Sequence, residues 1–252
     1  MFRFIALSAL VAFTNARGTI NFDGNKAELT SPGYPNPYGN SINDITVIAE
    51  PPGSSLNAIS AKTTVRTDVI PSSVLTSPLV TNWGDWTVPS YCGAGHFVGG
   101  MVLRTEGSID GDDTALNAIR FLCNSFRGNG DVLSTATPHQ GYWGGWGREF
   151  RCTAPDYAIG FELRSEPSIN GDDTAGNNLR LICADYLYAQ FGIEKLTILE
   201  GDGTGWGYWT GQQKCPRGSA LCGLKVQIEH PIDGDDTALN NVAAYCCTLP
   251  KM

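Results

Sequence analysis

The sequence GDDTALN occupies residues 111–117, returns as GDDTAGN at residues 171–177, and appears again as GDDTALN at residues 234–240. A catalytic loop needs only one copy, whereas a corner of a symmetric scaffold needs one copy in each symmetry-related unit. Three copies within a chain of 252 residues therefore favour an internally repeated fold.

Other landmarks repeat with the same spacing. Trp143 lies 60 residues after Trp83, and Trp206 lies 63 residues after Trp143. A second tryptophan and two cysteines in each copy keep these two separations. All the tryptophans of the chain belong to the pattern: Trp83, Trp86, Trp143, Trp146, Trp206 and Trp209. Three homologous units are therefore predicted, at about residues 74–131, 132–193 and 194–252.

Each unit has the two-residue period of half-buried β-strands. In the segment AIGFELRSEP (158–167), the apolar Ile159, Phe161 and Leu163 lie on one face, and residues 177–183 alternate in the same way. The acidic loop between them is rich in Gly, Asp, Asn and Thr, so the two strands are expected to form an antiparallel hairpin. One further strand before each tryptophan pair and one at the pair itself bring the expected number to about four per unit.

These strands predict an all-β fold with three four-stranded antiparallel sheets. A unit of about 60 residues is marginally stable alone, but three units around a pseudo-threefold axis can turn one face of each sheet onto a common core. This arrangement is a β-prism. A β-trefoil is the second choice because its units are typically shorter, and propellers ordinarily have four to eight blades.

The eight cysteines suggest a disulfide framework, for which 105 connectivities are possible. Antiparallel pairing should bring the entry of the first hairpin strand beside the exit of the second, which is where Cys152 and Cys183 stand. Each bond should stabilise the fold by roughly 3–4 kcal/mol. The adjacency of Cys246 and Cys247 leaves an exchange of their partners open. Threefold symmetry predicts the pairs Cys92–Cys123, Cys152–Cys183 and Cys215–Cys246, which leaves Cys222 for Cys247.

The beginning of the chain and its charge indicate a secreted protein. Residues 1–16 have a basic start, an apolar run of ten residues and a small-residue end, which together predict a signal peptide. No later stretch has the roughly 18 consecutive apolar residues of a spanning helix. The formal net charge of −8 argues against nucleic acid as a partner. We therefore expect an extracellular protein without a membrane span.

A family resemblance is carried by the second unit. The motif WGGWG (143–147), then Cys152, then AIGFELRSEPSINGDDTAGNNLRLIC (158–183) resembles the repeat of the vitelline membrane outer layer protein 1 family. The similarity extends over about residues 74–252. It implies a secreted type I β-prism, first known from the outer layer of the egg's vitelline membrane and related in fold to plant lectins. Carbohydrate association has been suggested for this family, but a shared fold does not confer binding.

The segment before the repeats, residues 17–73, has a different resemblance. Its stretch LTSPGYPNPYGNSINDITVIAEPPGSSLNAI (29–59) is similar to the opening of a CUB domain. The cysteine and tryptophan that the CUB family places next are absent, and the segment is about half as long as that domain. We therefore expect a remnant with one or two strands, or a chain from which part of the domain is missing.

The repeated acidic turns have a metal-binding and a structural interpretation. An EF-hand loop that starts at Asp110 would need Gly at its sixth position and Glu at its twelfth, where Ala115 and Phe121 stand. A structural turn is therefore favoured, and no metal or other cofactor is expected. One aspartate of each pair should cap the turn through backbone N–H groups. The six residues concerned are Asp112, Asp113, Asp172, Asp173, Asp235 and Asp236.

The other aspartate of each pair is expected to face an arginine. Arg104 and Arg120 have Arg164 and Arg180 as counterparts in the second unit, but the third unit has Gln227 and Ala243 at the equivalent positions. Their joint loss suggests that the two arginines of a unit share one neighbourhood.

The tryptophans also have two interpretations. Their rings would stack on the apolar face of a sugar, and the neighbouring glycines would let a ligand approach the backbone. Alternatively, large rings fill the ends of the prism and cover the gaps between sheets. Threefold repetition favours packing, but glycan contact stays open for all six.

Little in the sequence indicates catalysis. His96, His139 and His230 do not occupy equivalent positions, and no metalloprotease, nucleophile-elbow or phosphate-loop motif occurs. Repeated carboxylates at Glu106, Glu166 and Glu229 would suit glycoside chemistry, but carboxylates in repeated turns more often serve the turn itself. We do not expect an enzyme.

The sequence therefore predicts a structural component of an extracellular coat or secretion, of egg-envelope or mucus type, whose partners are coat or matrix proteins. A lectin-like protein that binds chitin-type or other glycans is the alternative, and a weak glycan-processing enzyme ranks third.

Overall fold

The computed structural model describes residues 19–23, 26–30, 69–109, 113–170, 173–185, 187, 195–232 and 236–250. The chain divides into two compact units, Met1–Arg66 and Thr67–Met252. In the first unit, β1 (Thr19–Asp23) and β2 (Lys26–Thr30) form an antiparallel pair. The expected signal peptide and most of the CUB-like segment lie outside the described residues. No helix in the described part of the chain is both long and apolar enough to cross a membrane.

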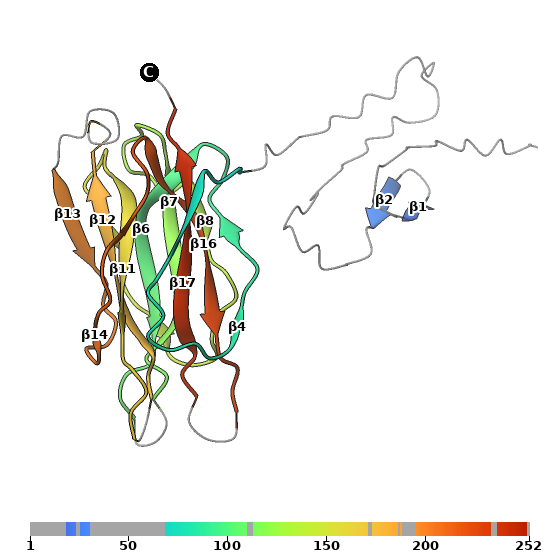
Figure 1. Ribbon diagram of the computed structural model, residues 1–252. Coiled ribbons are helices and arrows are strands. Elements are labelled where there is room, and N and C mark those ends of the chain that lie inside the picture. Colours follow the sequence, from blue (N-terminus) through green and yellow to red (C-terminus); the bar gives the residue numbers. More distant parts are fainter. Residues whose placement is uncertain are drawn as a thin grey trace, which may run out of the picture. The chain divides into compact units, whose positions relative to one another are not determined.

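Three long antiparallel hairpins form the frame of the second unit, and their turns lie at the same end of it (Figure 1). Each hairpin consists of the two strands that flank one acidic loop. The hairpins are β6 (His96–Thr105) with β7 (Leu116–Ser125), β11 (Tyr157–Ser165) with β12 (Gly176–Ala184), and β16 (Ser219–Ile228) with β17 (Leu239–Thr248).

Short outer strands extend each hairpin on both sides. On one side a single strand pairs with the second hairpin strand: β8 (Ser134–Ala136), β13 (Leu196–Glu200) or β3 (Ser73–Thr76). On the other side the position is divided into two short strands: β9 (Gly145–Trp146) and β10 (Phe150–Arg151), β14 (Tyr208–Trp209) and β15 (Gln213–Lys214), or β4 (Asp85–Trp86) and β5 (Ser90–Tyr91). The prediction of an all-β prism with three four-stranded antiparallel sheets is therefore confirmed.

The sheets do not coincide with the sequence repeats. Each hairpin pairs with the outer strands of the following repeat, so that β6–β7 take β8, β9 and β10 as neighbours. No repeat follows the third hairpin, and β16–β17 instead pair with β3, β4 and β5 from the start of the first repeat. The first and last repeats thus complete one sheet together and close the ring.

Equivalent apolar positions from the three hairpins form layers in the common core. Met101, Phe161 and Leu224 occupy the same position in their repeats, and none of them is exposed to solvent. The expected alternation holds for Phe161 and Leu163, which both belong to this core. It fails at Ile159, because a register shift between Ala158 and Gly160 turns that side chain into a second apolar cluster.

Four disulfides are present, and three of them connect neighbouring sheets. Cys92 follows β5 and donates its backbone N–H to the carbonyl of Cys222 in β16, whereas its disulfide partner Cys123 lies in β7 of another sheet. The sequence argument placed both cysteines of a pair on one hairpin, but the first belongs to an outer strand paired with the preceding hairpin. The bonds are Cys92–Cys123, Cys152–Cys183, Cys215–Cys246 and, within the third hairpin, Cys222–Cys247.

Ring closure predicts that the prism tolerates circular permutation at one place. Residues 126–133 connect β7 to β8, and the equivalent connection in the third sheet is the gap between the end of β17 and the start of β3, where Cys246 pairs with Ser73. A chain with a Gly-Ser linker from Pro250 to Val69 and new ends between Asn129 and Gly130 should fold with the same four disulfides. Peptide mapping of the unreduced protein checks this.

The matched control deletes residues 69–91 without replacing them. It keeps every cysteine but removes the outer strands of the third sheet, so it should fail to form the native bonds. Native pairing in the deletion variant, or scrambled pairing in the permuted chain, would contradict the closed-ring description.

Candidate functional site

The strongest candidate sites are three corners, each made of an acidic loop and the tryptophan loop of the next repeat. The acidic loops are residues 106–115, 166–175 and 229–238, and the tryptophan loops are residues 141–147, 204–210 and 81–87, in matching order. Each acidic loop joins the two strands of a hairpin. Each tryptophan loop leads into an outer strand of the same sheet.

A relay of three side chains ties the two loops of a corner together. Thr114 donates its hydroxyl to Oε2 of Glu106 at 2.7 Å and accepts a hydrogen bond from Nδ2 of Asn117 at 2.6 Å. The Oδ1 atom of the fully buried Asn117 then accepts the backbone N–H of Trp143 at 3.0 Å. The glutamates that the sequence offered for glycoside chemistry thus hold a turn, because their carboxylates bind the loop threonine.

The relay recurs at the other two corners. Thr174 donates to Glu166 at 2.7 Å, and Oδ1 of Asn177 accepts the hydroxyl of Thr204 at 2.6 Å. In the third corner the same roles fall to Glu229, Thr237 and Asn240, whose Oδ1 accepts the hydroxyl of Thr81 at 2.7 Å. The triplicated GDDTA(L/G)N motif therefore supplies the threonine and asparagine of three equivalent relays, which differ in the group that the asparagine oxygen accepts.

The aspartates fit the turn-capping prediction where they are described. Oδ1 of Asp113 accepts the backbone N–H of Ile109 at 2.7 Å, and Oδ1 of Asp173 accepts that of Ile169 at 2.6 Å. Asp236 is also buried. The first aspartate of each pair, and with it the expected arginine contact, lies outside the described residues.

A strained alanine follows each threonine. Ala115, Ala175 and Ala238 have φ angles of 47°, 45° and 48°, which non-glycine residues rarely adopt. In each loop the carbonyl of this alanine accepts the backbone N–H of the loop glutamate at 2.7–2.8 Å. Such strain persists only where surrounding contacts hold it, so the turns are rigid structural elements.

The arginines identified from the sequence bind the tryptophan loops. Arg104 donates Nε to the carbonyl of Gly144, and Arg164 donates Nη2 to the carbonyl of Gly207, both at 3.2 Å. In the third corner Gln227 donates Nε2 to the carbonyl of Gly84 at 3.0 Å. Glutamine therefore replaces the arginine by supplying the same hydrogen bond.

A cation covers the second tryptophan of each pair. Cζ of Arg120 lies 4.1 Å from the ring centre of Trp146, and Cζ of Arg180 lies 3.8 Å from that of Trp209. Both arginines of a unit thus share one tryptophan neighbourhood, as their joint loss suggested. Lys225, which the repeat analysis did not single out, covers the remaining ring of Trp86 at 4.8 Å.

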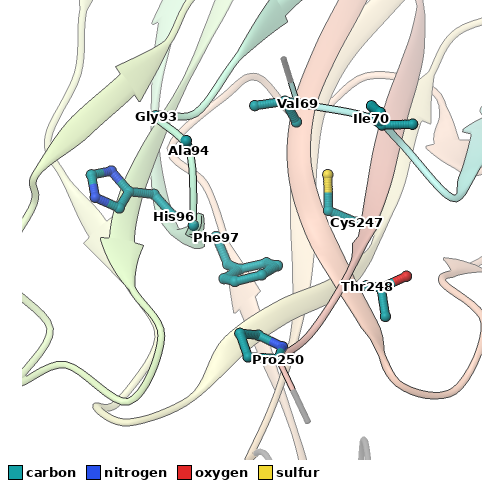
Figure 2. Close-up of a pocket in the computed structure, with 10 residues that line it drawn as sticks. Val69, Ile70, Gly93, Ala94, His96, Phe97, Cys247, Thr248 and Pro250 are labelled. Atoms are coloured by element: carbon teal, nitrogen blue, oxygen red, sulfur yellow. The ribbon is translucent and has the colours of Figure 1, made fainter. Parts of the chain in front are cut away.

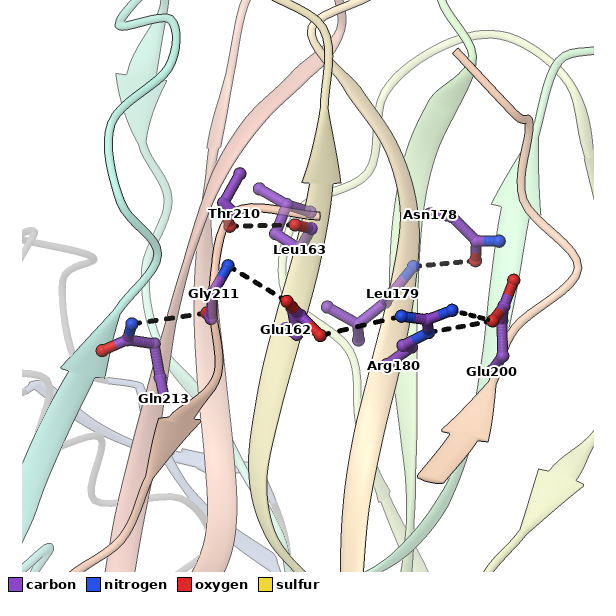
Figure 3. A network of polar contacts seen from close by, with 9 residues as sticks. All are labelled: Glu162, Leu163, Asn178, Leu179, Arg180, Glu200, Thr210, Gly211 and Gln213. Carbon is purple, nitrogen blue, oxygen red and sulfur yellow. Dashed lines mark hydrogen bonds and ion pairs between the residues drawn. The ribbon is translucent and has the colours of Figure 1, made fainter. Parts of the chain in front are cut away.

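A polar network surrounds Arg180 on the outer face of the second sheet (Figure 3). Its guanidinium is 2.6 Å from Oε2 of Glu200 and 3.9 Å from Oε2 of Glu162. Oε1 of Glu162 also accepts the backbone N–H of Gly211 at 3.1 Å. The cation above Trp209 is therefore neutralised by two carboxylates, one of them buried.

None of the six tryptophans enters the core. Trp143 and Trp86 keep 42% and 37% of their surface exposed, and the other four are half-buried. The rings therefore lie on the surface of the prism beside the acidic loops. Exposed aromatic faces with adjacent charged groups can bind planar or amphipathic ligands, including sugar rings.

A separate pocket of about 250 Å³ lies near Cys247 and contains none of the predicted tryptophan or acidic-turn residues (Figure 2). Its lining is mostly apolar, including Val69, Ile70 and Phe97. The one ionisable side chain of the lining, His96, has Nδ1 2.8 Å from Oγ of Ser134. This pocket offers no pair of acid and base. Within the described ranges, no group of three or more His, Cys, Asp or Glu could hold a metal.

The tryptophan loops predict a sharp contrast between two neighbouring glycines. Gly144 has a φ angle of 69°, and a Cβ added there would lie 2.2 Å from the carbonyl oxygen of Thr105, whereas one added at Gly145 would meet nothing within 4 Å. Gly144→Ala should therefore lower the free energy of unfolding by about 2–3 kcal/mol, whereas Gly145→Ala should change it by no more than about 0.5 kcal/mol. Thermal unfolding checks this, with an expected loss of roughly 5–10 °C for the first variant.

Equal effects of the two substitutions would contradict this description. Gly144 would then not be required by the close approach of the Thr105 carbonyl, and the alternative, that the glycine lets a ligand approach the backbone, would be favoured.

Comparisons with known proteins identify relatives of the repeated region. The family model for vitelline membrane outer layer protein I matches residues 73–249. The vitelline membrane outer layer protein 1 homologs of Mus musculus and Homo sapiens are each 40% identical over 171 and 172 residues, covering 66% of this chain and 78% of theirs.

Solved structures with a similar chain path include two lectins. A mannose-binding jacalin-related lectin from Ananas comosus is 12% identical, with a TM-score of 0.40 over 69% of this chain and 98% of its own. Calystegia sepium agglutinin is 11% identical, with a TM-score of 0.42 over 70% and 96%. The family match spans the whole prism, and the chain therefore belongs to the vitelline membrane outer layer protein I family.

Proposed function

We propose that this protein is a secreted structural component of an extracellular coat or secretion, hardened by its disulfides. The observation that carries the proposal is the set of three bonds that join neighbouring sheets, at Cys92–Cys123, Cys152–Cys183 and Cys215–Cys246. Each pair of neighbouring sheets is joined by one of these bonds. Two sheets therefore cannot separate fully, and expose the core between them, unless that bond is reduced. Such bonds persist in oxidising, extracellular surroundings.

The corners support a structural function as well. Glu106, Thr114 and Asn117 and their counterparts are bound to one another, so their polar groups fix loops to outer strands. The expected signal peptide and a net charge of −8 suit export and solubility before assembly. Coat or matrix proteins are the proposed partners.

A lectin-like function is the second candidate, and the exposed rings of Trp143 and Trp86 favour it. They lie at different corners, and each has charged or polar neighbours. Glycan-processing activity has less support, because the repeated glutamates are bound by loop threonines. Glycan-processing activity would be supported if the protein turned over an oligosaccharide and one of three substitutions abolished this turnover: Glu106→Gln, Glu166→Gln or Glu229→Gln.

Sequential extraction of the native extracellular material, combined with a glycan screen, separates the two candidates. We expect the protein to be abundant in the fraction that resists dilute buffer, and the purified protein to bind neither a glycan array nor insoluble chitin. Trp143→Ala and Trp86→Ala should leave its retention unchanged.

Glycan binding that Trp143→Ala or Trp86→Ala abolished, while the half-buried Trp206→Phe preserved it, would replace the structural proposal with the lectin-like one. Recovery only in the soluble fraction, at trace amounts, would contradict a coat function.

A further inference from the structure

Two histidines that are unrelated in the repeat pattern meet at the surface of the prism. The ring centres of His139 and His230 are 5.9 Å apart, and the ring of Tyr142 lies 6.3 Å from the first and 6.0 Å from the second. His139 and Tyr142 stand between β8 and β9, which border the first hairpin, whereas His230 follows β16 of the third. The cluster therefore bridges two sheets.

This cluster breaks the threefold symmetry of the prism. The positions equivalent to His139 and Tyr142 are Leu79 and Asn82 in the first repeat. No histidine or tyrosine occupies any equivalent position at the other two junctions between neighbouring sheets, where the six residues are Leu79, Asn82, Pro167, Asp202, Gly205 and Gly107. Two junctions between sheets fold without these rings, so folding does not explain why the remaining junction has them.

The side chains are also accessible. Tyr142 is 51% exposed, and both histidines are exposed. Burial in the core therefore does not account for the cluster. Three rings gathered at the surface, two of them imidazoles, form a set of donors that an ion from solution can reach.

The separations match those of ligands around one metal ion. Metal–nitrogen bonds of about 2.0–2.1 Å place tetrahedral ligand atoms about 3.3 Å apart and the centres of two bound imidazoles about 5–6 Å apart. Oη of Tyr142 lies 3.3 Å from Nδ1 of His230, and the two imidazole centres are separated by 5.9 Å.

We propose that His139, His230 and Tyr142 form a binding site for one divalent transition-metal ion, with water completing the coordination. Imidazole nitrogens suit Zn²⁺ and Cu²⁺, and Cu²⁺ binds nitrogen ligands more strongly. The bound ion would join the first sheet to the third at the prism end. The proposal is independent of the coat or lectin function.

Neighbouring charges limit the affinity. The guanidinium of Arg104 donates to the carbonyls of Gly141 and Tyr142, so a positive charge lies near the site. Glu229 precedes His230, but its Oε2 accepts hydrogen bonds from Thr237. We therefore expect micromolar binding of the metal.

Titration calorimetry of the full secreted chain with zinc chloride and copper(II) chloride tests the proposal. We expect one ion per chain, with His139→Ala and His230→Ala each weakening binding at least about tenfold and Tyr142→Phe weakening it less. Copper bound to the unaltered chain should show nitrogen hyperfine splitting in electron paramagnetic resonance, reduced in either histidine variant.

His96→Ala is the matched control, because His96 is the remaining histidine of the chain and lies against Ser134 away from the cluster. It should bind like the unaltered protein. Near-ultraviolet circular dichroism verifies that every variant is folded. Unchanged affinity in the double variant His139→Ala/His230→Ala, or an equal loss in His96→Ala, would overturn the proposal.

Discussion

The hairpin of a repeat that folded alone would have no paired strand at either of its edges, and this constraint governs the rest of the structure. The hairpin β11–β12 has backbone donors and acceptors along both edges, and the strands that satisfy them belong to the next repeat. Each repeat is therefore incomplete until another repeat joins it. The inter-sheet disulfide lies where the chain crosses from one sheet to the next, as at Cys152, and makes that crossing covalent.

Much of this architecture could be predicted because repetition makes equivalent positions visible. The spacing of the tryptophans and cysteines indicated three units, and alternation at Phe161 and Leu163 indicated core-facing strands. The pairing of each hairpin with the outer strands of the following repeat could not be predicted. The spacing of the landmarks is the same wherever the boundary between two repeats is placed, so it does not show which strands share a sheet. The position of Ile159 depends on a register shift, which a two-residue period does not reveal. Lys225 covers Trp86 as Arg120 and Arg180 cover the other two rings, but it stands at a different position of the repeat. A comparison of equivalent positions could therefore not find it.

The site showed the same contrast between symmetric and unique features. The turn-capping aspartates Asp113 and Asp173 followed from the repeated loops, and the relay through Asn117 explains why those loops are triplicated. His139 and His230 appeared unrelated in the sequence, because equivalence within the repeat was the criterion applied to them. Their proximity arises from the curvature of three sheets around one axis, and the chain contains no local signal for it.

Closure of the ring also bears on the synthesis of the protein. Among the strands of the prism, β3, β4 and β5 leave the ribosome first, yet they pair with β16 and β17, and β17 ends at Thr248, more than 150 residues after Tyr91. At about 5–20 residues per second, translation of the intervening chain takes roughly 10–30 s. During that interval the early strands have exposed edges and no native partner. The ring therefore closes only after the last hairpin, β16–β17, has been synthesised. A closed ring also cannot gain repeats one at a time, as an open solenoid can.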